Sequence, residues 1–300
     1  AYMDASKDPS KVDGGAIFVT GNNVTISDTS FDDCNATNGG GAVYVIGNNT
    51  HILNCNFNDC TADDGGVVYV EGNDALINNA VITNNNANGD GGALYVNGDY
   101  ARLLNTKIIN TTAADDGGAI YWTGSNGTIY NITCINSKGV SATKPDGVNT
   151  SSTRGGAICL TGSDMTISKS TFESCVAYMD AGKDTSKVDG GALFVTGNNV
   201  TIADTSFSDC NAVHDGGSVY IIGNDTHIMN CTLKDSYATN GGAIYVAGDG
   251  ATISLSDFTH NNANRAELAH GGSINIEGDR ANVLGCNFTD SDAYLGGVIY

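Results

Sequence analysis

The sequence predicts an all-β protein folded as a right-handed parallel β-helix, a solenoid of about ten coils. A Gly-Gly pair followed by a small residue and then an aliphatic residue recurs along the whole chain. Most pairs lie 25 or 26 residues apart, a unit too short for a helical hairpin repeat. Within each unit, apolar and polar residues alternate over short runs, which is the pattern of β-strands. The pairs begin at Gly14, Gly40, Gly65, Gly91, Gly117, Gly155, Gly190, Gly216, Gly241, Gly271 and Gly296.

Each unit is expected to form three short strands. In the first unit these cover residues 16–19, residues 24–26 and the neighbourhood of Phe31. Ile17 and Val19 have aliphatic counterparts in the other units, so both positions should point inward. The positions of Ile26 and Phe31 are also apolar in the other units. One coil cannot bury three apolar faces by itself, and neighbouring coils must therefore stack.

The corners of the coil carry turn-forming residues. One glycine follows the first strand in all ten complete units, as at Gly21 and Gly47, which predicts a positive φ or a close backbone approach. Asn or Asp usually follows it. Another column of Asn and Asp, beginning with Asp28 and Asn54, lies between the second and third strands. Stacked amides of this kind are expected to form hydrogen bonds from coil to coil.

A second, longer repeat overlies the coils. Residues 1–36 recur at 177–212 with five differences, a shift of 176 residues. We therefore interpret residues 1–300 as a single β-helix segment of a longer array, in which 177–300 is a partial copy of 1–176. An array that grows by copying blocks of coils favours structure or display over a single active site.

Longer units place their extra residues at one corner, before the Gly-Gly pair. These insertions cover 138–153, 177–189 and 262–270, with 1–13 as a fourth. The first two come from consecutive coils and should touch. Because loops on a rigid scaffold commonly carry recognition, we expect the insertions to be binding loops.

Composition excludes several classes of partner. The chain has 33 acidic and 13 basic residues, a formal net charge of −20, so we expect no nucleic-acid partner. No stretch approaches the roughly 20 apolar residues of a membrane span, and we expect none in this segment. The nine cysteines fit buried thiols better than a disulfide framework, although adjacent coils could also be linked.

Two columns are candidates for binding. An acidic column before the Gly-Gly pair, comprising Asp64, Asp90, Asp116, Asp189 and Asp215, predicts either Ca²⁺ sites or a solvated edge. No other cofactor is expected. The outward position of the first strand predicts an exposed aromatic stripe, either a sugar- or protein-binding surface or a self-stacking ladder. Its members are Phe18, Tyr44, Tyr69, Tyr95, Tyr121, Phe194, Tyr220 and Tyr245.

Eleven Asn-x-Ser/Thr sequons occur in the chain. Those at Asn23, Asn149 and Asn199 lie at expected corners or in a loop, where a secreted protein could carry glycans.

The repeat resembles those of known surface proteins. Gly14–Ile17 followed by Phe31–Cys34 is similar to the two-part repeat of bacterial polymorphic outer-membrane proteins. The phrase Gly-Asn-Asn-Val-Thr-Ile, at 21–26 and 197–202, is more similar still to adhesin-like surface proteins of methanogenic archaea. The resemblance covers nearly the whole chain. It implies extracellular display, with the cell wall, cell-surface glycans or proteins of another cell as partners.

We therefore expect a non-catalytic, extracellular adhesin-like or cell-surface structural protein that displays binding loops on a rod. A filament or sheath subunit that polymerises end to end is the alternative. A β-helical polysaccharide lyase or hydrolase fits less well, because its carboxylates would cluster in one cleft, whereas here they lie in periodic columns. His51 and His227 are equivalent residues of the copied blocks and are expected at outward strand positions.

Overall fold

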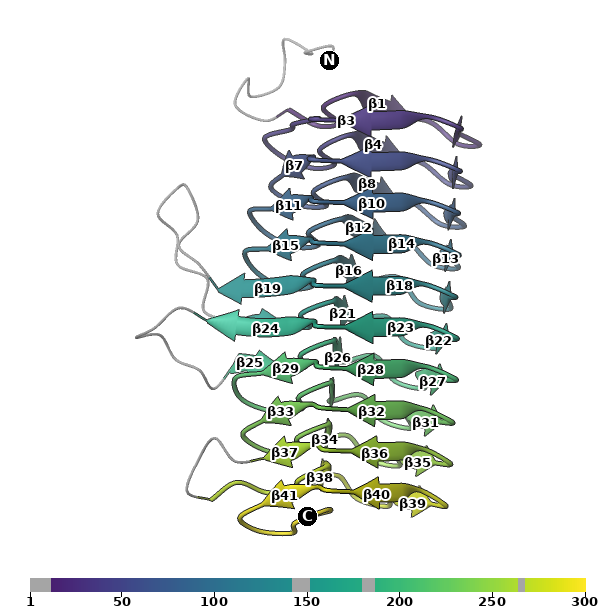
Figure 1. Cartoon of the computed structure of the whole chain (residues 1–300). Helices are drawn as coiled ribbons and strands as arrows, with labels where there is room; N and C mark the ends of the chain where they lie inside the picture. The colour runs from purple at the N-terminus through teal and green to yellow at the C-terminus, as the bar shows by residue number, and fades with distance from the viewer. Residues whose placement is uncertain (1–11, 142–151, 180–186, 264–267) are drawn as a thin grey trace.

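The computed structural model describes residues 12–141, 152–179, 187–263 and 268–300. Within these ranges the chain is all-β, with 41 short strands and no α-helix. The strands stack coil upon coil along one axis, and every strand pairing is parallel (Figure 1). The predicted parallel β-helix of about ten coils is confirmed.

The first sheet follows the Gly-Gly signature and contains ten strands in sequence order. Its strands are β1 (Ile17–Thr20), β4 (Val43–Ile46), β8 (Val68–Glu71), β12 (Leu94–Asn97), β16 (Ile120–Trp122), β21 (Ile158–Leu160), β26 (Leu193–Val195), β30 (Val219–Ile221), β34 (Ile244–Val246) and β38 (Ile274–Ile276). Residues two apart, such as Val43 and Val45, point into the core and are fully buried, as predicted.

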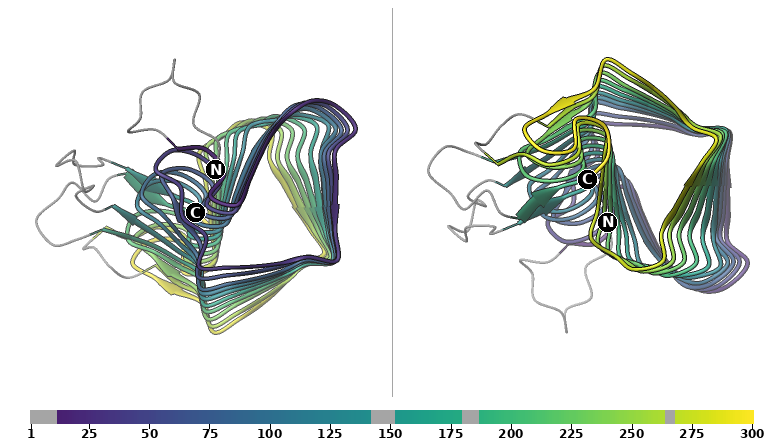
Figure 2. Two further views of the ribbon diagram at one scale, coloured as in Figure 1. Left: turned by 90° about the horizontal axis from the view of Figure 1, so that it is seen from above. Right: turned by 90° about the horizontal axis from the view of Figure 1, so that it is seen from below.

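The second and third sheets each contribute one central inward residue per strand, such as Ile52 and Phe57. The second sheet comprises β2 (Thr25–Ser27), β5 (His51–Leu53), β9 (Leu76–Asn78), β13 (Arg102–Leu104), β17 (Thr128–Tyr130), β22 (Thr166–Ser168), β27 (Thr201–Ala203), β31 (His227–Met229), β35 (Thr252–Ser254) and β39 (Asn282–Leu284). The third comprises β3 (Ser30–Asp32), β6 (Asn56–Asn58), β10 (Val81–Thr83), β14 (Lys107–Ile109), β18 (Thr133–Ile135), β23 (Thr171–Glu173), β28 (Ser206–Ser208), β32 (Thr232–Lys234), β36 (Asp257–Thr259) and β40 (Asn287–Thr289). Seen along the axis, the three sheets enclose one continuous core (Figure 2).

A fourth sheet was not predicted. It comprises β7 (Thr61–Ala62), β11 (Asn86–Ala87), β15 (Thr112–Ala113), β19 (Lys138–Ser141), β24 (Val176–Met179), β29 (Asn211–Ala212), β33 (Tyr237–Ala238), β37 (Asn262–Ala263) and β41 (Asp292–Ala293). Most of these strands are two residues long, and their buried position is usually alanine. The prediction of three strands per coil was therefore incomplete, because so short and small a strand lacks an apolar alternation.

The Gly-Gly signature has two distinct physical causes. Its first glycine has a positive φ, for example +61° at Gly40, a conformation that residues with a Cβ rarely adopt. Its second glycine has no room for a side chain. A Cβ on Gly41 would overlap the carbonyl oxygen of Gly66 in the next coil and lie 2.8 Å from that of Thr61. The pair therefore makes the tight turn and also lets the fourth sheet approach the first.

The corners are tied together by side chains. Between the first and second sheets, the side-chain oxygen of one coil accepts the backbone N–H of the next. Asn48 Oδ1, for instance, accepts the N–H of Asn73 at 2.8 Å. This ladder runs through Asn22, Asn48, Asn73, Asp99, Ser125, Ser163, Asn198, Asn224, Asp249 and Asp279. At the next corner Asn54 Nδ2 donates to Asp28 Oδ1 at 3.0 Å, which confirms the predicted amide column.

We expect Gly223→Ala to destabilise the protein and Gly21→Ala, at the equivalent corner of the first coil, to leave its stability nearly unchanged. A Cβ on residue 223 would overlap the carbonyl oxygen of Gly197, whereas a Cβ on residue 21 would meet no heavy atom within 4 Å. Overpacking typically costs about 1–3 kcal/mol. Urea unfolding followed by circular dichroism measures the difference, and equal midpoints for the two variants would contradict the close approach at this corner.

Candidate functional site at the acidic corner

The acidic column lies on the segment that joins the fourth sheet to the first. Three of its carboxylates accept hydrogen bonds from backbone N–H groups of the next coil. Asp64 Oδ1 accepts the N–H of Asp90 at 2.9 Å, and Asp90 Oδ1 accepts that of Asp116 at 3.0 Å. Asp116 Oδ1 then accepts the N–H of Arg154 at 2.9 Å. The column is thus a third corner ladder, a role that neither sequence interpretation included, although its regular place before each Gly-Gly pair was a visible signal.

Crowding of these carboxylates changes their protonation. Burial, and then the neighbouring charge of Asp116, raise the pKa of Asp90 to about 7. Burial and the charge of Asp115 raise the pKa of Asp116 to about 7, although the Arg154 guanidinium opposes the shift. Burial also raises the pKa of Asp215 to about 6. The deprotonated form of these carboxylates is therefore destabilised at this corner, and binding of a cation or a proton would relieve the destabilisation.

The structure brings candidate ligands together at two places on this corner. Asp90, Asp115 and Asp116 form one group, and their donor atoms lie within 4.8 Å of one another. This group offers only carboxylate oxygens, the ligands that Ca²⁺ prefers. Asp64, also a predicted Ca²⁺ ligand, belongs to neither group of the described residues. Calcium binding at this corner stays a prediction.

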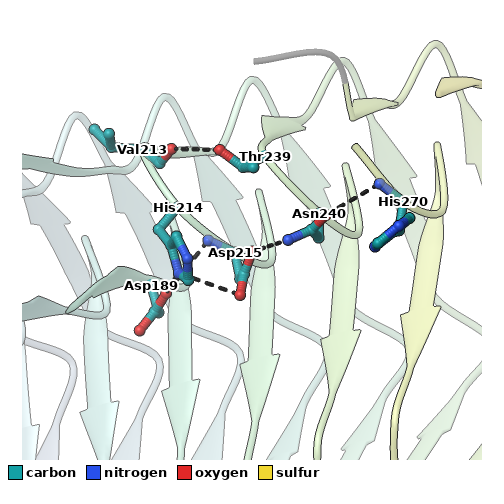
Figure 3. Close-up of polar contacts among 7 residues, drawn as sticks. All are labelled: Asp189, Val213, His214, Asp215, Thr239, Asn240 and His270. Atoms are coloured by element: carbon teal, nitrogen blue, oxygen red, sulfur yellow. Dashed lines mark hydrogen bonds and ion pairs between the residues drawn. The ribbon is translucent and has the colours of Figure 1, made fainter. Parts of the chain in front are cut away.

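The second group combines Asp189 and Asp215 with His214, which the sequence had not singled out. His214 Nδ1 lies 2.9 Å from Asp189 Oδ1 and 3.1 Å from Asp215 Oδ2 (Figure 3). Asn240 Nδ2 donates to Asp215 Oδ1 at 2.8 Å and so fixes that carboxylate. The imidazole comes from the turn before β30, while Asp189 ends a short strand, β25 (Val188–Asp189). Two consecutive coils therefore supply the group.

The aromatic stripe lies on the outward side of the first sheet, but its expected exposure is wrong. Tyr44 is only 8% exposed and Phe194 only 2%, because the acidic-corner segment folds over the rings. A Cβ on Gly39, in that segment, would lie 2.6 Å from the Tyr44 ring. The remaining rings except Phe18, in the first coil, are buried or partly buried: Tyr69, Tyr95, Tyr121, Tyr220 and Tyr245.

The covered rings stack on one another. Ring centroids of Tyr44 and Tyr69 are 4.6 Å apart, and those of Tyr69 and Tyr95 are 4.4 Å apart, with nearly parallel planes. Burial raises the pKa of these phenols above its usual range. The stripe is therefore a self-stacking ladder under the corner and presents no continuous aromatic surface to solvent.

The bases of two insertions form a platform beside this corner. β19 and β24, each four residues long, pair along their whole length, and β20 (Thr153–Arg154) pairs with β25. Ala177, Met179, Val188 and Ala212 form a small apolar cluster separate from the main core. We call the strands β19, β20, β24 and β25 the loop platform (Figure 1). The expected contact between the two insertions is confirmed at their bases, while 142–151 and 180–186 lie outside the described residues.

Other predicted positions are spread over the rod. Asn23 and Asn199 are exposed and have φ values of 60° and 54°, whereas Asn149 lies outside the described residues. Asn199 Nδ2 donates to Asp164 Oδ1 at 2.7 Å. His51 and His227 are partly exposed strand residues of the second sheet. All nine cysteines are free thiols, and seven of them are buried, in agreement with the preferred interpretation.

No protein-family model matches the chain, and no curated protein sequence matches it significantly. In the described part of the chain, no helix has the length and apolarity needed to cross a membrane.

The raised pKa values predict that stability falls as pH rises. An acid whose pKa is raised by folding keeps a proton that the unfolded chain has released, so between about pH 4 and 7 unfolding releases protons. Asp90→Asn keeps an oxygen acceptor for the N–H of Asp116 but carries no charge. We expect it to exceed the wild type in stability at pH 8, by about 1 kcal/mol, and to match it near pH 4.

Urea unfolding in a chelator-containing buffer across this pH range measures the effect without bound metal. Asp99→Asn is the matched control, since Asp99 Oδ1 also accepts the N–H of the next coil, from Ser125 at 2.8 Å. The same pH-dependent gain in both variants would contradict burial at the acidic corner as its cause.

Proposed function

We propose that the protein is a non-catalytic, extracellular adhesin-like or cell-surface rod that presents binding loops. The observation that carries this proposal is the loop platform, where two long insertions from consecutive coils emerge from paired strands. Neighbouring coils without insertions have only two-residue strands at this place, such as β15 and β29. The extra strand length therefore accompanies the extra loops.

The platform gives the loops a firm base. Lys138 to Ser141 pair residue by residue with Val176 to Met179, and the return strands pair next to them. Met179 and Val188, which lie near the two ends of the second insertion, are both buried. Binding loops gain affinity when their ends are held in place, because less conformational freedom is lost on binding.

The charge of the two insertions differs from that of the rest of the rod. Lys138 and Lys187 are exposed at the bases of the two insertions, in a chain that is otherwise strongly acidic. Lys144 and Lys183 belong to the same insertions by sequence and lie outside the described residues. By sequence the two insertions also carry four aspartates, Asp146, Asp180, Asp184 and Asp189, so they have no net charge and repel an acidic partner less than the rest of the rod does.

The non-catalytic part of the proposal rests on the use of the carboxylates. Asp64, Asp90 and Asp116 each accept a backbone N–H of the next coil, which is a structural task repeated along the rod. The sequons and the resemblance to adhesin-like surface proteins support an extracellular location. Together they favour attachment over turnover.

Replacing 142–151 and 180–186 with short Gly-Ser linkers tests the proposal. The wild-type chain should bind purified cell walls or immobilised cell-surface glycans, and the double replacement should abolish most of this binding while leaving the circular dichroism spectrum unchanged. The same replacement of 264–267 is the matched control, and it should retain binding. Equal binding by the double replacement and the wild type would exclude the platform as the binding site.

A parallel assay tests the absence of catalysis. The purified chain is incubated with the same glycans and with acidic polysaccharides, and new reducing or unsaturated ends are measured. We expect none. Cleavage that disappears when Asp90 or Asp189 is changed to Asn would overturn the non-catalytic proposal, whatever the outcome of the binding experiment.

A further inference from the structure

We propose that Asp189, His214 and Asp215 form a binding site for a divalent transition-metal ion, with Zn²⁺ as the best fit. The three side chains offer His214 Nδ1 and one oxygen from each carboxylate, all within 4.8 Å of one another. The site is independent of the proposed loop-binding function, because it lies in the acidic corner itself and uses residues that the structure describes.

The mixture of donor atoms separates this site from a calcium site. Ca²⁺ takes six to eight oxygen ligands, whereas Zn²⁺ is bound by imidazole nitrogen and carboxylate oxygen, usually with four ligands. The neighbouring group of Asp90, Asp115 and Asp116 contains oxygen donors alone. His214 therefore changes the metal preference of a corner that is otherwise built in the same way.

Donor spacing also fits a small ion. In a tetrahedral zinc site with bonds of about 2.0–2.1 Å, neighbouring ligand atoms lie about 3.3 Å apart. His214 Nδ1 is 2.9 Å from Asp189 Oδ1 and 3.1 Å from Asp215 Oδ2. Small adjustments of these side chains would admit the ion, and a fourth position would remain for water or another ligand.

Charge balance points in the same direction. The Asp189 and Asp215 side chains are only 9% and 5% exposed, and burying two adjacent carboxylates is costly without compensating charge. Protonation of His214 would supply one positive charge. A divalent ion bound to the neutral imidazole would supply two, which matches the two carboxylates.

The surroundings hold the ligands in place. Asn240 Nδ2 donates to Asp215 Oδ1, and Asn240 Oδ1 accepts the N–H of His270 at 3.0 Å (Figure 3). The backbone N–H of His214 donates to Val188 O at 3.0 Å. Such outer hydrogen bonds orient metal ligands and support their affinity. The ion would also fasten β25, a strand of the loop platform, to the following coil.

The duplicated block supplies a natural comparison. After 36 nearly identical residues, the copies differ at three successive positions, with Thr37, Asn38 and Gly39 replaced by 213–215, which read Val-His-Asp. In the first copy Asn38 Nδ2 donates to Asp13 Oδ1, so an amide–carboxylate hydrogen bond occupies the equivalent place. Two of the three ligands are therefore specific to the second copy.

Zinc titration of the purified 300-residue chain tests the site, with a chromophoric chelator as competitor. We expect one tight Zn²⁺ per chain, and His214→Asn should weaken its binding about 100-fold or more. Asparagine is the residue that the first copy carries here, so this variant should fold. His260→Asn is the matched control, because His260 also lies between two aspartates, Asp235 and Asp290, but is half-exposed.

Substituting Co²⁺ for Zn²⁺ gives a second readout. Its visible absorption in a four-coordinate site should appear in the wild type and the His260→Asn variant and disappear in His214→Asn. Asp115→His should create a second zinc site, because it gives the all-oxygen group an imidazole in the equivalent position. No saturable zinc binding by the wild type, or equal affinity of the wild type and His214→Asn, would overturn the proposal.

Discussion

The close stacking of parallel coils determines what most side chains in this protein touch. Parallel strands lie about 4.8 Å apart, so a residue in one coil meets its own counterpart in the next. Any side chain in a column must therefore be compatible with a copy of itself. Amides satisfy this condition because each can donate to one neighbour and accept from the other, as Asn54 does when it donates to Asp28 and accepts from Asn79. Stacked phenylalanine and tyrosine rings satisfy it as well, as Phe31 and Phe57 show with centroids 5.0 Å apart.

Carboxylates satisfy the condition poorly, and the acidic corner shows how the fold accommodates them. Asp64, Asp90 and Asp116 each use one oxygen to accept a backbone N–H from the next coil, which stabilises the turn before the Gly-Gly pair. The neighbouring carboxylates still repel one another, and burial adds to this cost, so the pKa values of Asp90 and Asp116 rise. Arg154 interrupts the column and relieves part of the charge. The same corner covers the tyrosine ladder, and so its stability and that of the first sheet are linked.

The repeated features of the structure could be predicted from the sequence because repetition makes them visible. Gly41 and Gly66 belong to a column in which no side chain fits, and Ile52 belongs to a column that is always apolar. Features that repeat weakly were missed. The fourth sheet escaped notice because its inward residue is alanine, and the tyrosines were expected to be exposed because nothing in the sequence showed the corner folding over them. His214 was missed because it occurs only once in its column.

A function that depends on one place in a stacked array must reside in a departure from the repeat. His214 is such a departure, because Val188 and Thr239 occupy its column in the coils on either side. No second imidazole competes with it there, so it can approach two aspartates of the adjacent column. The loop platform is a departure of the same kind, since among the described strands of the fourth sheet only β19 and β24 exceed two residues. Both departures involve β25, which carries Asp189 and belongs to the loop platform. The regular columns therefore make the rod rigid, and the irregular corner carries the proposed binding sites.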